Sequence, residues 1–213
     1  ILYGGYDFEG SLIKLIEATG NSAPKVAVNE KAVPKPLLGS EHDHDHDHDT
    51  HNHEHEAKPK AEETVPDPHV WHSPNNGIAI VNVISQKLSN LEPAQAETYQ
   101  KRAKEINNEL KQIHQWIEAQ IATIPPEKRK LITTHDALGY YVDTYNLEFE
   151  GALSGFTTEE SPTAARVREL VKKIQKTQVP TIFAETSVNP KLIETVAKEA
   201  QVKVSPRELY EDG

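Results

Sequence analysis

The sequence contains no cysteine among its 213 residues. This absence excludes disulfide bonds, zinc sites built from thiolates and thiol nucleophiles. No run of 18 or more apolar residues occurs either, so no segment is predicted to span a membrane. Apolar residues make up only 36% of the chain, which is low for a compact globule, and one long polar segment accounts for much of the shortfall.

Basic residues are also too few to form a large positive face. The formal net charge is -10, and residues 41–63 contribute -7 of it, because nine acidic residues there oppose two lysines. The rest of the chain is nearly balanced, which argues against a nucleic-acid partner. An acidic chain with eleven histidines is better suited to binding cations.

The pattern of apolar residues predicts an α/β protein with two lobes. Short strands at 1–3 and 25–28 flank a helix at 7–19, which is typical of a βαβ unit with a parallel sheet. Apolar residues three and four positions apart predict one long helix over 93–124, about 45 Å in length. Strands and helices alternate after it. We therefore expect an N-terminal lobe at 1–92, a linker helix at 93–124 and a C-terminal lobe at 125–213.

Residues 29–66 show no apolar periodicity, and we predict a flexible loop there. Its centre alternates histidine with acidic residues, which offer imidazole nitrogen and carboxylate oxygen to a metal ion. Seven histidines are the expected ligands for metal capture: His42, His44, His46, His48, His51, His53 and His55. A solvated acidic linker is the alternative. A remnant of an affinity tag is disfavoured, because the segment is internal and its spacing is irregular.

Two further histidines are expected where a strand gives way to a helix. His69 lies shortly before Ser73 and Pro74, which are typical of the N-cap and first position of a helix, here predicted over 74–89. His135 follows a strand at 131–133 and is expected at the start of the next helix. Ligand-binding residues of α/β sheets usually lie at such positions. The 66 residues between the two histidines form no local metal motif, so an incidental role for either one stays open.

The octapeptide at 67–74, Asp-Pro-His-Val-Trp-His-Ser-Pro, resembles the central motif of the zinc and manganese solute-binding proteins of ABC importers. Residues 134–137, 183–186 and 209–212 resemble further landmarks of that family, in the same order. The resemblance covers nearly the whole chain. It implies two βα lobes joined by the long helix, with a metal site in the cleft between them.

The resemblance also implies the metal ligands, which are His69, His135 and Asp212. Glu185 matches a family position near the site, where it would orient a ligand, although a surface carboxylate at a strand end is the alternative. Members that take manganese tend to carry Glu at the position of His135, so Zn²⁺ is expected and Mn²⁺ is less favoured. His72 occupies a position that is usually apolar and is assigned to the surface, and His114 is assigned to packing or the surface.

The implied protein is a monomeric receptor outside the cytoplasm, in the periplasm or at the membrane surface. It would capture Zn²⁺ and deliver it to an ABC permease, and it would not be an enzyme. The family's first ligand and its signal or lipoprotein segment are expected upstream of residue 1, and its last strand and helix beyond residue 213.

Three alternatives remain at this point. A zinc hydrolase could use Glu185 or Glu211 as a general base, but the sequence contains no His-Glu-x-x-His motif. A metal buffer or adhesin could act through the histidine-rich loop alone. A manganese receptor is the nearest alternative within the same family.

Overall fold

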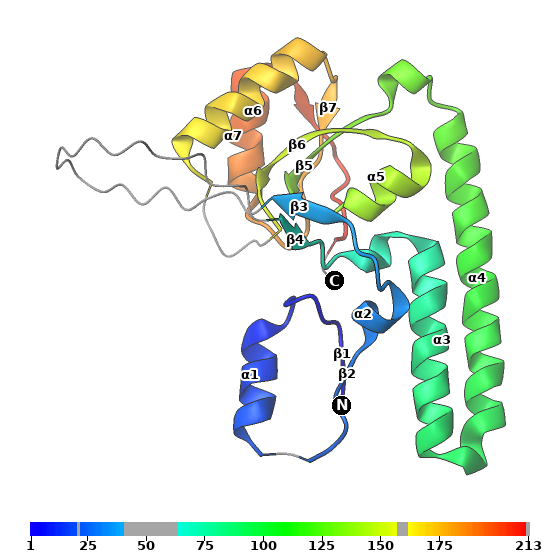
Figure 1. Cartoon of the computed structure of the whole chain (residues 1–213). Coiled ribbons are helices and arrows are strands. Elements are labelled where there is room, and N and C mark those ends of the chain that lie inside the picture. The colour runs from blue at the N-terminus through cyan, green and yellow to red at the C-terminus, as the bar shows by residue number, and fades with distance from the viewer. Residues whose placement is uncertain (21, 41–63, 157–161, 212–213) are drawn as a thin grey trace.

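The computed structural model describes residues 1–20, 22–40, 64–156 and 162–211. A small N-terminal α/β unit and a larger C-terminal α/β lobe lie beside a pair of long helices (Figure 1). Each sheet that the described residues form has two strands, and three of the four strand pairs are parallel. The expected mixed α/β architecture with short parallel sheets and a long helix is therefore confirmed.

The N-terminal unit is the predicted βαβ arrangement. Strands β1 (Leu2–Tyr3) and β2 (Val26–Ala27) pair in parallel, and helix α1 (Gly10–Ala18) connects them. The helix begins later than residue 7, because Tyr6 and Asp7 adopt left-handed backbone conformations with φ of 55° and 59°. Gly20 follows the helix at φ +64°, the conformation that commonly ends a helix.

The prediction of an unstructured loop over 29–66 was wrong at both of its ends. Helix α2 (Val28–Ala32) begins directly after β2, and strands β3 (Leu38–Ser40) and β4 (Thr64–Pro66) form an antiparallel pair. Each strand has only three residues, which is too few to show a periodic pattern of apolar residues in the sequence. The strands therefore form because they pair with each other and make tertiary contacts. The seven histidines predicted to capture metal lie in 41–63, outside the described residues.

The predicted long helix is present as α4 (Ala96–Ala122), after a short 3₁₀ helix η2 (Pro93–Gln95). It packs along helix α3 (Pro74–Leu91), which starts at Ser73 and Pro74 as expected (Figure 1). The two helices approach closely at Gly77, where an added Cβ would lie 3.3 Å from Leu110 Cδ1. The long helix thus forms half of a helical hairpin.

The C-terminal lobe contains two parallel strand pairs covered by helices. Their bounds are β5 (Lys130–His135), α5 (Gly139–Tyr145), β6 (Glu148–Ser154), α6 (Ala164–Thr177), β7 (Thr181–Ile182), α7 (Pro190–Ala200) and β8 (Lys203–Val204). Strand β5 pairs with β6, and β7 pairs with β8. A 3₁₀ helix η3 (Pro126–Lys128) precedes β5. Apolar side chains from α6, α7 and the strands form the buried core: Ile132, Leu153, Ile174, Ile182 and Ile193.

One predicted helix start in this lobe was displaced. His135 is the last residue of β5, and α5 begins only at Gly139, so residues 134–137 do not start a helix. Strand pairing with β6 extends to Ser154 opposite His135 and prolongs the strand. Helix α6 begins at Ala164, where the Thr163 hydroxyl accepts a hydrogen bond from the Arg166 backbone N–H at 3.2 Å.

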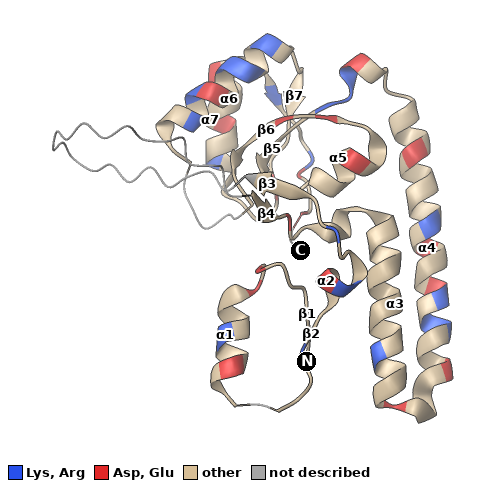
Figure 2. Ribbon diagram, viewed as in Figure 1, with Lys and Arg blue, Asp and Glu red and all other residues tan. Residues whose placement is uncertain are grey.

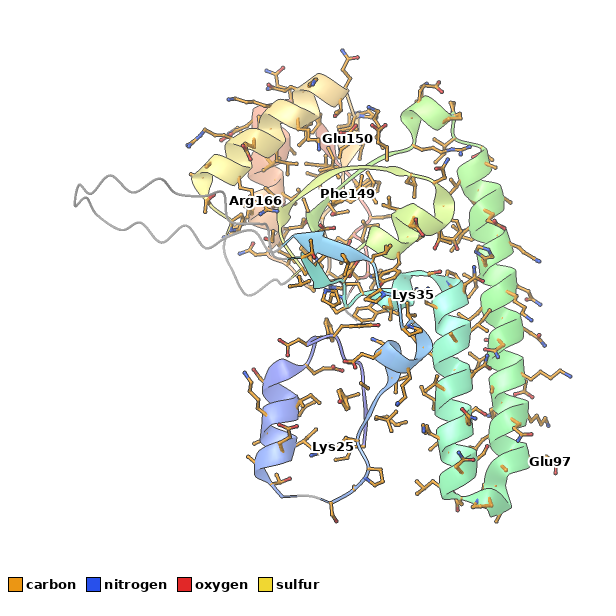
Figure 3. The ribbon with its side chains drawn as sticks, in the orientation of Figure 1. Lys25, Lys35, Glu97, Phe149, Glu150 and Arg166 are labelled. Carbon is orange, nitrogen blue, oxygen red and sulfur yellow. The ribbon has the colours of Figure 1, made fainter. Side chains whose placement is uncertain are left out.

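Charged side chains are spread over the helices. Figure 2 shows basic and acidic residues interspersed along α4 and α6. Glu150, labelled in Figure 3 on β6, accepts a hydrogen bond from Lys130 Nζ of β5 at 2.9 Å.

Among the described residues, no helix is both long enough and apolar enough to cross a membrane.

Candidate metal centre

His69 is fully buried directly before the short 3₁₀ helix η1 (Val70–His72), which leads into α3. The carboxylate of Asp67 determines the position of its ring. Asp67 Oδ1 accepts a hydrogen bond from the backbone N–H of His69 at 2.9 Å and lies 2.8 Å from His69 Nδ1. An Nδ1–H donor to a carboxylate leaves Nε2 as the nitrogen that can coordinate a metal ion.

His135 is also fully buried, at the carboxyl end of β5. Glu185 contacts it twice. One carboxylate oxygen forms a short hydrogen bond with His135 Nδ1, and the other accepts from the backbone N–H of His135 at 2.8 Å. The second oxygen also accepts from the backbone N–H of Thr134. The Glu185 carboxylate thus contacts both the backbone and the ring of His135, as the Asp67 carboxylate does for His69.

The two histidines converge although they are distant in the sequence. Their ring centroids lie 5.5 Å apart in an edge-on arrangement. Glu211 Oε2 lies 3.0 Å from His135 Nδ1. The ligand atoms that His135, Glu185 and Glu211 offer all lie within 4.8 Å of one another. Trp71 Nε1–H donates to the backbone oxygen of Glu211 at 3.0 Å, which joins the chain near its end to η1.

The buried acidic cluster changes the protonation of Glu211. Burial raises the pKa of Glu211 to about 8, the hydrogen bond from His135 opposes the rise, and the neighbouring Glu185 carboxylate adds to it. Burial, and next the charge of Asp67, also raise the pKa of Asp136. The pKa values of two carboxyl groups beside the histidines are thus raised. This is expected where buried negative charges lie close together, and a bound cation would neutralise part of that charge.

Aromatic rings surround His69. The rings of Phe8, Trp71 and Phe156 have centroids 5.9, 5.4 and 6.0 Å from that of His69, and they come from three separate segments. Phe156 packs so closely on Gly39 of β3 that an added Cβ would lie 2.0 Å from its Cζ. Such an apolar shell limits access of water to the imidazoles.

The structure brings His69, His135 and Glu185 together, whereas Asp212 lies outside the described residues. Glu211, which the sequence offered as the neighbour of Asp212 and as a possible general base but not as a ligand, lies with Glu185 in the described cluster. The contact of Asp67 with His69 was missed, although an acidic residue two positions before its partner is a common local hydrogen-bonding arrangement.

The two remaining described histidines differ in their distance from the cluster. The expectation that His72 is a surface residue was wrong: it is half-buried, and its ring stacks on His69 at a centroid distance of 6.5 Å, because η1 turns it back toward that ring. His114 lies on α4, where Nδ1 is 3.1 Å from the Tyr145 hydroxyl, so it packs between α4 and α5.

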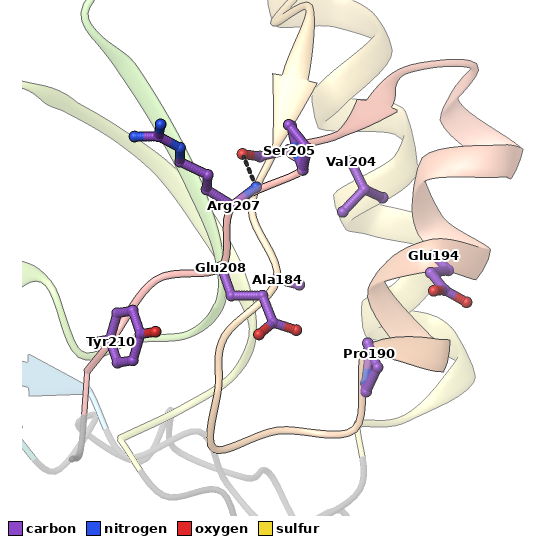
Figure 4. A pocket seen from close by; sticks show the side chains of 9 residues that line it. Ala184, Pro190, Glu194, Val204, Ser205, Arg207, Glu208 and Tyr210 are labelled. Carbon is purple, nitrogen blue, oxygen red and sulfur yellow. Dashed lines mark hydrogen bonds between the residues drawn. The ribbon is translucent and has the colours of Figure 1, made fainter.

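A separate pocket of about 500 Å³ lies beside β8 and α7 (Figure 4). Glu194 and Glu208 are among the residues that line it, and Ser205 Oγ, also in the lining, accepts a hydrogen bond from the Arg207 backbone N–H at 3.1 Å. None of the described residues that line it is a histidine. Its chemistry therefore does not match the buried cluster.

Comparison with known proteins shows similarity to metal-binding proteins of ABC importers. A family model described as the zinc-uptake complex component A, periplasmic (ZnuA) matches residues 1–212. The manganese-binding lipoprotein MntA of Bacillus subtilis is 31% identical over 203 residues, which are 95% of this chain and 60% of MntA. The manganese ABC transporter substrate-binding lipoprotein PsaA of Streptococcus pneumoniae is 30% identical over 65% of this chain and 44% of its own length.

Solved structures show the same architecture. The periplasmic zinc binding protein TroA of Treponema pallidum superposes with a TM-score of 0.82 at 26% identity, covering 100% of this chain and 70% of TroA. The laminin binding protein Lmb of Streptococcus agalactiae, described as having adhesin and metal transporting activity, gives a TM-score of 0.60 at 29% identity over 66% of this chain and 53% of Lmb. The chain spans 44–60% of the length of the two curated relatives.

Proposed function

The chain belongs to the ZnuA family of metal ABC transporter substrate-binding proteins, and on that basis we propose that the protein is a receptor that captures Zn²⁺ and delivers it to an ABC permease. The family is a periplasmic one whose members take part in metal uptake, so the expected location outside the cytoplasm is confirmed. The family acts in transport rather than catalysis, which leaves the hydrolase alternative without support.

One observation carries the proposal. Two buried imidazoles from different parts of the chain converge, and each is hydrogen-bonded through Nδ1 to its own carboxylate. This pairing of histidine with carboxylate is typical of metal ligands, because it fixes the tautomer and raises the basicity of the coordinating nitrogen. We propose that His69 and His135 coordinate zinc through Nε2, that Asp212 supplies an oxygen ligand and that Glu185 orients His135.

The choice of zinc over manganese rests on the donor atoms. Imidazole nitrogen suits zinc, whereas manganese prefers ligand sets rich in oxygen. Manganese uptake is the second candidate function. The names of MntA and PsaA favour it, as do the two buried carboxylates of Glu185 and Glu211 beside His135.

A competition titration against a chelator tests the proposal, with Zn²⁺ and Mn²⁺ in parallel. Four forms of the protein are measured: with and without residues 41–56, and each of these with and without the substitution His135→Ala. We expect one tight zinc site that survives the deletion and is lost with His135→Ala. His114→Ala is the matched control, because His114 lies on α4 away from the cluster.

Each other outcome selects an alternative. Manganese binding as tight as zinc binding would make the protein a manganese receptor. Loss of tight binding with the deletion alone would favour a buffer or adhesin that acts through the histidine-rich segment. In our proposal that segment collects zinc weakly and passes it to the buried site.

A further inference from the structure

We propose that Asp67 is a positioning residue for His69, and that the C-terminal lobe holds Asp67 in place through Gly139 and Tyr140. This inference rests on the proposed function, in which His69 is a zinc ligand. It concerns how the ligand is oriented, because Asp67 acts through the imidazole of His69.

The first contact fixes the ring of His69. A single oxygen, Asp67 Oδ1, lies 2.9 Å from the backbone nitrogen of His69 and 2.8 Å from its Nδ1. Both residues are almost completely buried, with exposed fractions of 2% and 0%. The same carboxylate therefore fixes the local backbone turn and the ring orientation, and directs Nε2 away from Asp67.

The second set of contacts fixes Asp67 itself. Its backbone N–H donates to the Leu37 carbonyl at 2.8 Å, and its carbonyl accepts from the Tyr140 hydroxyl at 3.2 Å. The same hydroxyl accepts from the Leu37 backbone N–H at 3.0 Å. Tyr140 is a buried residue of α5 in the C-terminal lobe, so a side chain from that lobe joins two segments that precede α3.

The third contact involves the other oxygen of the Asp67 carboxylate, Oδ2. Gly139, the first residue of α5, lies against Asp67 so closely that an added Cβ would be 2.7 Å from Oδ2. Real Cβ atoms essentially never approach another atom within 3.0 Å, so a methyl group here must displace the Asp67 carboxylate. Only glycine at position 139 therefore permits the observed contact.

A comparison with His135 shows what is particular to Asp67. Glu185 contacts the backbone and Nδ1 of His135 in the same way, but both residues belong to the C-terminal lobe. Asp67 and His69 precede the helical hairpin, whereas Gly139 and Tyr140 follow it. The orientation of His69 thus depends on a contact across the two halves of the chain, whereas that of His135 does not.

Two measurements on the same variants test the inference. The first is the zinc dissociation constant from chelator competition. The second is the tautomer of His69 in the zinc-free protein, read from long-range ¹H–¹⁵N correlations of the ring. Asp67→Ala removes the acceptor, Asp67→Asn keeps an acceptor without the charge, and Gly139→Ala displaces the carboxylate. Asp143→Asn and Gly155→Ala are controls: Asp143 is exposed on α5, and an added Cβ at Gly155 meets nothing within 4 Å.

We expect Asp67→Ala to weaken zinc binding about 10- to 100-fold and to lose the Nδ1–H tautomer of His69. Gly139→Ala is expected to change both readouts in the same direction, and Asp67→Asn to keep the tautomer with an intermediate loss of affinity. If Asp67→Ala fails to fold, Gly139→Ala and Asp67→Asn decide the matter. Unchanged affinity and an unchanged tautomer in the folded variants would overturn the inference. Absence of tight zinc binding in the unmodified protein would instead overturn the proposed function, since the tautomer is measured without zinc.

Discussion

The buried carboxyl group of Glu211 makes the stability of the metal-free protein depend on pH. Burial raises its pKa from 4.5 to about 8 in the folded protein, and the residue is only 3% exposed. Between these two values the folded state holds one proton more than the unfolded state at this group. The unfolding free energy therefore falls as pH rises through this window, and the contribution is lost above the folded pKa.

The size of the effect follows from the distance between the two pKa values. Each pH unit between 4.5 and about 8 is worth about 1.4 kcal/mol, which bounds the change in unfolding free energy at about 5 kcal/mol. Local relaxation around the charged group lowers this bound, and we expect a change of about 2–4 kcal/mol between about pH 5 and pH 8. Replacing Glu211 by Gln mimics the protonated group and should remove this part of the pH dependence.

Urea unfolding of the protein and of Glu211→Gln, both with a metal chelator, measures the difference at each pH. Taking the difference cancels the titration of groups that the two proteins share. The Glu211→Gln variant should match the unmodified protein near pH 5 and become the more stable of the two toward pH 8. Glu208→Gln on the exposed part of the same segment controls for the loss of one carboxyl group. A difference that stays constant across this range would contradict the prediction, because Glu211 would then have the same charge throughout.

The site and the core allow three more tests. Zinc affinity should decline as the solution becomes acidic, because a coordinating imidazole must be neutral; titrations from about pH 8 to 5 measure this, and a flat profile would exclude imidazole ligands. Gly39→Ala should displace the Phe156 ring and speed zinc release in stopped-flow chelation, whereas Gly155→Ala should not. Ile182→Ala should cost about 2–5 kcal/mol of unfolding free energy by opening a cavity, whereas Leu91→Ala, at a side chain that is 78% exposed, should cost little; equal losses would be incompatible with the described core.

The outcome for individual segments shows which kinds of signal a sequence carries. The long helix α4 was predicted well because apolar residues recur along it every three to four positions. The helix opening at Pro74 was predicted because proline at the first helical position is a local preference. The strands β3 and β4 were missed because each is specified only by its partner, which lies far along the chain.

The same distinction applies to the site. Local patterns in the chain were enough to select His69 and His135 as candidates, because each was expected between a strand and a helix, whereas Glu185 was selected only through the family resemblance. Composition was enough to define the donor chemistry, since a chain without cysteine or methionine can offer a metal ion only nitrogen and oxygen.

How these residues act together depends on the folded arrangement. Folding places the two imidazoles 5.5 Å apart, brings Glu211 beside His135 and sets Gly139 against Asp67. These contacts join segments that are far apart in the sequence, and their strength depends on burial and on short interatomic distances. Neither quantity has a local pattern in the sequence, because both arise only when the chain has folded and excluded water from the cluster.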